Sequence, residues 1–167
     1  MKHQRKGNQK MIQATRNSNE AQSPNYIRLD LFSNVDHTAS DVDEFKPLIA
    51  YTSQETNKTK YFLPATVTRT YESRYWDLFY KIQNFSAGES PATGNIYLGT
   101  KEYPYGFYNV KIWQQDSTTN IDPNDSSIVK VIWNGILNLG AENNPAVTFN
   151  EYTETTESPV YITNATI

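Results

Sequence analysis

Apolar residues recur along the chain in short segments, which polar residues, Gly and Pro separate. This pattern is typical of the strands and turns of an antiparallel sandwich or barrel. Helix signals are scarce, so we expect less than about a tenth of the chain to be α-helical, well below the usual share. The pattern predicts strands at residues 12–15, 26–33, 47–52, 60–63, 75–83, 95–100, 107–114, 128–133, 136–139, 147–152 and 160–163.

Two of these segments indicate which side chains face the core, because side chains alternate across a strand. In residues 107–114 the alternation leaves Asn109 and Lys111 in water, and Trp113 is placed to cover an edge or a neighbour. The residues expected to face the core are Tyr108, Val110 and Ile112 in this segment, and Trp76, Leu78, Tyr80 and Ile82 in residues 75–83.

Residues 128–139 form a long apolar stretch whose β-branched side chains favour strand over helix. The pair Asn134-Gly135 permits the positive φ angles of a tight turn, so we expect a hairpin or a kinked strand there. Residues 117–126 are polar and contain the stop signal Asp122-Pro123. They should form a loop at an exposed end of the sandwich.

The composition agrees with a strand-rich domain and excludes several chemistries. The chain has 167 residues, enough for one buried core, and 13% of them are aromatic. It contains no Cys, so disulfides, thiolate metal sites and Cys nucleophiles are excluded. No apolar stretch approaches the roughly 20 residues of a membrane helix, and the polar start is unlike a secretory signal. We therefore expect no membrane association and no conventional export.

Charge is distributed unevenly along the chain. The net charge is −3, but four of the 15 basic residues lie in the first ten positions, and the chain after them has a balance of −7. A basic tail on an acidic body indicates a nucleic-acid arm or an acidic protein partner, and a solvated or vector-derived tail is the alternative. The basic residues of this arm are Lys2, Arg5, Lys6 and Lys10.

The organisation that follows is one domain with two tails. We divide the chain into a basic arm and lead-in at residues 1–25, a β-sandwich at residues 26–152 and a C-terminal tail at residues 153–167. The expected fold class is all-β, an antiparallel and roughly Ig-like sandwich with extended N- and C-terminal arms.

Residues that could carry chemistry are few. The two histidines, His3 and His37, belong to no spaced set of ligands or triad partners. Asp36, Asp41 and the residues 43–44 supply oxygen ligands but lack the spacing of a calcium loop. The seven glycines are scattered, and Gly94, Gly99 and Gly106 are interpreted as turn residues. We therefore expect no enzyme, no cofactor and no metal.

Exposed Tyr and Trp side chains leave carbohydrate binding as an alternative, since a β-sandwich is a common host for such a platform. That function requires three or more coplanar exposed aromatic rings on one sheet or loop end. Most aromatic residues here are expected to fill the core or an interface instead.

Several short motifs resemble a recurring pattern in small virion proteins of tailed phages, in particular crAss-like and related phages of Bacteroidetes hosts. Residues 106–115 resemble Gly-x-Tyr-x-Tyr-x-Ile-Tyr-Glu-Gln, residues 119–123 its polar loop ending near Asp-Pro, and residues 132–139 its following strand. The starts at residues 11–17 and 27–31 and the middle at residues 68–75 also look like these proteins.

The chain departs from that pattern in two respects. Val110 and Trp113 stand where the pattern often has Tyr, and residues 1–10 have no counterpart in it. The resemblance implies a structural virion component made in the host cytoplasm, in the head-to-tail neck or tail ring. A capsid-surface auxiliary protein and a carbohydrate-binding module used in host adsorption are the alternatives.

The expected partners are other virion proteins (portal, tail, neck or capsid subunits) and copies of this chain in a ring or lattice, with nucleic acid the less expected partner. Gly before x-Tyr at a strand start suits a tyrosine corner, and we assign Tyr108 to it. The residues expected to serve structure and assembly are Gly106, Tyr108, Trp113, Trp133, Gly135, Lys2, Arg5, Lys6 and Lys10.

Overall fold

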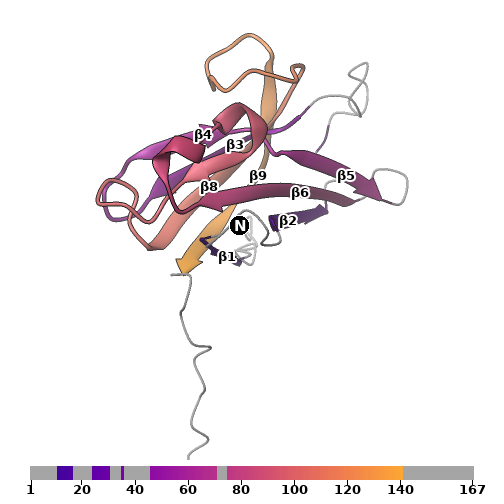
Figure 1. Ribbon diagram of the computed structural model, residues 1–167. Coiled ribbons are helices and arrows are strands. Elements are labelled where there is room, and N and C mark those ends of the chain that lie inside the picture. The colour runs from indigo at the N-terminus through magenta and orange to yellow at the C-terminus, as the bar shows by residue number, and fades with distance from the viewer. Residues whose placement is uncertain (1–10, 17–23, 31–34, 36–45, 71–74, 141–167) are drawn as a thin grey trace, which may run out of the picture.

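The computed structural model describes residues 11–16, 24–30, 35, 46–70 and 75–140 (Figure 1). In this part of the chain there are strands and two short 3-10 helices but no α-helix, as predicted. The elements are β1 (Met11–Thr15), β2 (Asn25–Asp30), β3 (Leu48–Ser53), β4 (Thr59–Phe62), β5 (Thr66–Thr70), β6 (Tyr75–Gln83), η1 (Ser86–Gly88), η2 (Pro91–Thr93), β7 (Asn95–Tyr97), β8 (Gly106–Gln115) and β9 (Ile128–Gly140).

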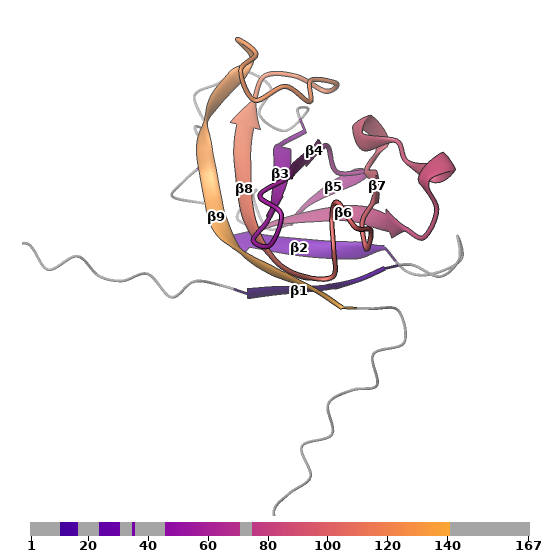
Figure 2. The same cartoon turned by 90° about the vertical axis from the view of Figure 1, so that its left-hand side faces the viewer.

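The strands form a β-sandwich of two sheets. One sheet has the order β1-β9-β8-β3-β4, and the other has the order β2-β6-β5 with β7 added beside the end of β6. Figure 2 shows β9 curving from beside β8 to β1, which lies beside β2 of the second sheet. The all-β prediction is confirmed.

The prediction of a purely antiparallel sandwich is wrong for two pairs of strands. β1 runs parallel to β9, and β7 runs parallel to β6. Parallel neighbours need a long connection, and both pairs have one. Almost the whole chain separates β1 from β9, and the η1–η2 segment carries the chain back from the end of β6 to the start of β7.

The core lies between the sheets and consists of the alternating side chains that the sequence indicated. Trp76, Leu78, Tyr80 and Ile82 of β6 and Tyr108, Val110 and Ile112 of β8 are each at most 2% exposed. Tyr51 joins them, with its ring centroid 4.9 Å from that of Phe62 in an edge contact. Burial raises the pKa of the Tyr51 and Tyr80 hydroxyls. Both hydroxyls therefore stay neutral to a higher pH than that of an exposed tyrosine.

The predicted turn at Asn134-Gly135 is not present, because residues 128–140 form one continuous strand. Neither residue has a positive φ. The ladder is irregular near Ile132 instead, where the register of β8 against β9 shifts between Ile112 and Trp113. Gly135 is small for a packing reason, since a Cβ there would lie 2.1 Å from the Trp133 ring.

Other element boundaries also differ from the prediction. β5 was not predicted, and β7 ends three residues before the predicted strand at 95–100 does. The sandwich begins at β1 rather than at residue 26, so the predicted lead-in belongs partly to the sheet. The predicted strands at 147–152 and 160–163, the acidic stretch at 36–44, the basic residues 1–10 and the C-terminal tail at 153–167 lie outside the described residues.

Candidate assembly surface

The outer edge of β9 pairs with a described strand over only part of its length. On one side β9 pairs with β8 from Ile128 to Leu139, whereas on the other side β1 covers only Ile136–Gly140. Along residues 128–135 no described strand pairs with this edge. Val129 and Val131 are 38% and 40% exposed there. An uncovered strand edge presents backbone N–H and C=O groups to which another strand can add.

A groove continues from this edge between β1 and β2, with a volume of about 320 Å³. Met11 and Tyr26 on its rim are more than half exposed. The lining residues are Met11, Ile12, Gln13, Tyr26, Ile27, Arg28 and Trp133. Open edge and groove share Trp133, so they form one continuous surface, which we call the β9 edge surface.

Trp133 takes its place in this surface through Gly135. Both residues face inward on β9, two positions apart, and the indole ring occupies the space in which a Gly135 side chain would lie. The ring also packs against the core cluster and is partly exposed. The structure therefore brings together these two residues predicted for assembly.

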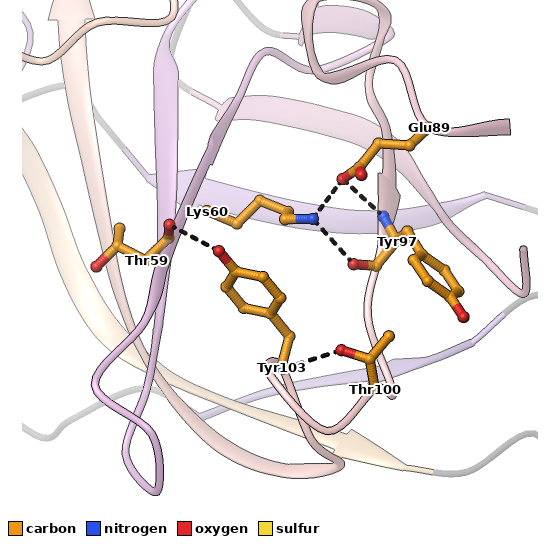
Figure 3. A network of polar contacts seen from close by, with 6 residues as sticks. All are labelled: Thr59, Lys60, Glu89, Tyr97, Thr100 and Tyr103. Atoms are coloured by element: carbon orange, nitrogen blue, oxygen red, sulfur yellow. Dashed lines mark hydrogen bonds and ion pairs between the residues drawn. The ribbon is translucent and has the colours of Figure 1, made fainter. Parts of the chain in front are cut away.

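The opposite edge of the same sheet, at β4, is closed by a polar network that Figure 3 shows. Lys60 Nζ lies 2.5 Å from Glu89 Oε1 and donates a hydrogen bond to the Tyr97 carbonyl. The same ammonium lies 4.5 Å from the centroid of the Tyr103 ring, whose hydroxyl donates to the Thr59 carbonyl. Burial raises the pKa of the Tyr103 hydroxyl. The segment between β6 and β8 is thereby fixed against β4.

β1 is anchored at its C-terminal end. The Asn25 side chain accepts from Thr15 N–H and donates to the Thr15 carbonyl. The next residue, Arg16, donates to the Tyr105 hydroxyl at 2.8 Å and to the Asn84 carbonyl. These contacts fix the end of β1 that lies away from the β9 edge surface.

Gly106 and Tyr108 begin β8 with the geometry predicted for a tyrosine corner. The Tyr108 ring is fully buried, and its hydroxyl donates to the Pro104 carbonyl, four residues upstream, at 2.5 Å. Gly106 has φ 125°, a conformation that L side chains rarely adopt. Both residues therefore shape the start of the strand and lie away from the β9 edge surface.

Trp113 lies on the outer face of the five-stranded sheet, on the opposite face from Trp133. The centroid of the Trp113 ring is 6.3 Å from that of the Tyr61 ring and 5.5 Å from Lys111 Nζ. Alternation places Asn109 and Lys111 on this exposed face, as predicted. The four basic residues of the arm, Lys2, Arg5, Lys6 and Lys10, lie outside the described residues.

None of the charged pairs was predicted from the sequence, and two of them involve partly or largely buried side chains. Lys60–Glu89 joins residues far apart in the chain, and Arg28–Asp77 is a cross-strand pair with two hydrogen bonds of 2.8 Å. The hydrogen bonds from Arg28 lower the pKa of the Asp77 carboxyl. The only signal was that Asp77 interrupts an aromatic strand, and its partner emerges only from the register of β2 against β6.

In the part of the chain that is described, no three His, Cys, Asp or Glu side chains lie close enough to hold a metal ion. None of the helices described is long and apolar enough to cross a membrane. In the comparisons with known proteins, no family model matches this chain, and no curated protein or solved structure matches it significantly.

Proposed function

We propose that this chain is a structural component of a tailed-phage virion, acting by protein–protein assembly in the head-to-tail neck or tail ring. The observation that carries the proposal is the part of β9 before Ile136, with which no described strand pairs on its outer side and in which Val129 and Val131 are exposed. Strand addition at such an edge gives affinity through main-chain hydrogen bonds and specificity through alternate side-chain pockets. The groove beside Trp133 supplies such a pocket.

The motif resemblance to small virion proteins of phages of Bacteroidetes hosts supports the same proposal independently. Its motifs include β8 and the second half of β9, which build the sheet that carries the open edge. A capsid-surface auxiliary protein is the alternative position, and it uses the same surface. We propose further that the chain performs no catalysis.

The position in the particle is tested by imaging. Antibodies against this chain, labelled with gold, should bind purified phage particles at the neck or tail in electron micrographs. Labelling spread over the head would favour the capsid alternative. Particles that carry no label and whose peptides lack this chain would overturn the virion proposal.

The mode of assembly is tested by charging the open edge. The double substitution Val129→Lys/Val131→Lys places two charges on exposed β9 positions, which should block strand addition and leave the fold intact. Incorporation into particles should fall at least about tenfold, the factor that about 1.4 kcal/mol of lost affinity gives. Thr118→Lys/Thr119→Lys in the exposed loop adds the same charge and should be incorporated normally. Equal incorporation of both variants would contradict edge addition.

The basic arm is the second element proposed to act in assembly. Residues 1–10 are polar and basic, and a segment of this kind cannot by itself offset the roughly 1–2 kcal/mol per residue needed to order its backbone. Its partner is proposed to be an adjacent virion protein with an acidic groove or open strand edge. Deleting residues 1–10 should leave the melting temperature nearly unchanged and lower incorporation. Unchanged incorporation would show that the arm has no assembly role.

A further inference from the structure

The outer face of the five-stranded sheet is hollowed at its centre. Across the sheet, Tyr61, Ala50, Lys111 and Asn134 stand opposite one another on β4, β3, β8 and β9. Ala50 is the small residue of this row, and the larger side chains on either side of it enclose a hollow of about 380 Å³. The residues that line it are Ala50, Thr52, Thr59, Tyr61, Asn109, Val110, Lys111 and Asn134.

One wall of the hollow is aromatic. Tyr61 lines it directly, and Trp113 lies behind, with an interplanar angle of 44° between the two rings. Both rings are partly exposed. This pair is not the coplanar row of three rings that a platform for long sugar chains requires. A single partly exposed ring beside a hollow instead suits stacking of one apolar ring face against it.

The remaining lining is polar and neutral except for one cation. The Thr52 and Thr59 hydroxyls are 2.8 Å apart, and each retains further hydrogen-bonding capacity. Asn109 accepts from Gln54 through its carbonyl oxygen, which leaves its amide nitrogen without a partner among the described residues. Hydroxyl and amide groups around an aromatic wall are the complement of a sugar ring, which has an apolar face and a rim of hydroxyls.

The charge of the hollow specifies the sugar further. Lys111 is the single charged residue of the lining, which includes no carboxylate. No ion pair joins Lys111 to any described residue, and its ammonium lies over the Trp113 ring. A cation on an otherwise neutral rim favours an anionic ligand, because a charge-assisted hydrogen bond is roughly twice as strong as a neutral one.

We propose that this hollow binds an acidic glycan through one terminal or branching ring that carries a carboxylate, as uronic and sialic acids do. The ring stacks on Tyr61, its carboxylate pairs with Lys111, and its hydroxyls bond to Thr52, Thr59 and Asn109. The volume lies at the small end of ligand sites, which span about 300–1,000 Å³, and suits a short segment of sugar. Only Asn134 belongs both to the hollow and to the β9 edge surface, and the groove beside Trp133 has no lining residue in common with the hollow.

The test uses the full chain, labelled with ¹⁵N, and three probes: 3′-sialyllactose, trigalacturonic acid and neutral lactose. At least one acidic probe should shift the backbone amide signals of Ala50, Tyr61 and Lys111. Lactose should bind at least about tenfold more weakly than that probe, which corresponds to about 1.4 kcal/mol. Shifts confined to other faces, or no shift with either acidic probe, would overturn the proposal.

Variants separate the charge from the stacking. Lys111→Met should weaken binding of the acidic probe about tenfold or more, while its NMR spectrum should remain that of a folded protein. The matched control is Lys101→Met, which removes an exposed lysine from the loop between β7 and β8 and should bind like the unmodified chain. Tyr61→Ala should weaken both acidic and neutral probes, because the stacking surface is lost. Equal binding by Lys111→Met and Lys101→Met would overturn the proposal that the hollow selects an acidic sugar.

Discussion

The two edges of the five-stranded sheet differ in which described segments pack beside them. At β4, the Lys60–Glu89 pair and the Tyr103 ring fix a neighbouring segment against the edge strand. At β9, residues 128–135 have no described strand beside them and expose two valines. The protections on this side are local, namely the exposed Lys130 and two shifts of register against β8. Lysines and bulges discourage indiscriminate pairing without closing an edge.

The difference shows where this fold places its capacity for association. The β4 edge is closed by a polar network whose partly buried ion pair makes that network costly to break. Among the described residues, the β9 side shows a lysine and shifts of register, which discourage unsuitable strands but still allow a strand with matching side chains to add. An interface is therefore expected on the β9 side, and substitutions on the two sides should have different consequences.

The largest change in unfolding free energy is expected from a substitution in the core between the two sheets. Tyr108→Ala removes a fully buried ring and should lower the free energy of unfolding by about 3–5 kcal/mol. Tyr108→Phe keeps the ring and loses only the hydrogen bond to Pro104, at a cost of about 1 kcal/mol. Urea unfolding measures both. An unchanged midpoint for the alanine variant would remove the corner assignment.

The closed edge comes next. Lys60→Met leaves the Glu89 carboxylate, 26% exposed, without its cation, and should cost about 1–3 kcal/mol in unfolding free energy. Lys58 provides the matched control, because its 3.7 Å pair with Glu102 is about 60% exposed on both sides. Lys58→Met should cost less than about 1 kcal/mol. Equal losses in thermal and urea unfolding would mean that the β4 edge is not closed as described.

The packing of Trp133 on Gly135 is expected to have an intermediate effect. Gly135→Ala forces the indole ring from its place and should cost about 1–3 kcal/mol, as overpacking does. Replacing the ring as well, in Gly135→Ala/Trp133→Leu, should recover part of this loss. Urea unfolding of the single and double variants measures the coupling. Simple additivity of the two substitutions would show that the ring and the glycine are independent.

The open edge should respond in association rather than in stability. Lys130→Val removes an exposed charge that discourages strand pairing, and it should change the unfolding free energy by less than about 0.5 kcal/mol. The same variant should self-associate at lower concentration than the unmodified chain, which sedimentation velocity can measure. Lys111→Val on the sheet face is the control, because it removes a charge away from any edge. A monomeric Lys130→Val variant at all concentrations would count against an accessible edge.

The smallest effect concerns acid. The Arg28 hydrogen bonds lower the pKa of the Asp77 carboxyl below its ordinary value of 3.8. A lowered pKa in the folded state means that the contribution to stability is complete above about pH 4 and is lost as pH falls through the lowered value. Plotted against pH from neutral to pH 2, the melting temperature should therefore fall less steeply for Asp77→Asn than for the unmodified chain. Parallel curves would assign the acid response to other carboxyls.

Sequence patterns predicted the centre of the fold better than its margins. β6 and β8 alternate strongly, because apolar and polar side chains are separated on their two faces, and their core residues were identified correctly. β5 was missed since its Thr-rich segment holds a single apolar side chain, Val67. Gly135 was taken for a turn residue because its neighbour Asn134 makes a turn dipeptide. Its role depends on the Trp133 rotamer, which no local pattern reveals.

The surfaces were predictable only in part for the same reason. Trp113 and Trp133 were identified as residues of interest, but the strand register decides that they lie on opposite faces. The β9 edge follows from the parallel pairing of β1 over only five residues, and nothing in the sequence near Met11 specifies its partner strand. Tertiary packing determines which distant segments pair, and the local alternation of apolar and polar residues does not reveal it.

The parallel pairing of β1 with β9 also determines how the protein responds to tension. β1 enters the sandwich at Met11, and β9 leaves it at Gly140, beside the other end of the same short ladder. A pull applied to the chain before Met11 and after Gly140 would draw the two strands past each other along their length. All hydrogen bonds of the ladder then bear the load together rather than breaking one after another. A subunit held through both of its ends would in this way resist stretching far better than so short a strand pair suggests.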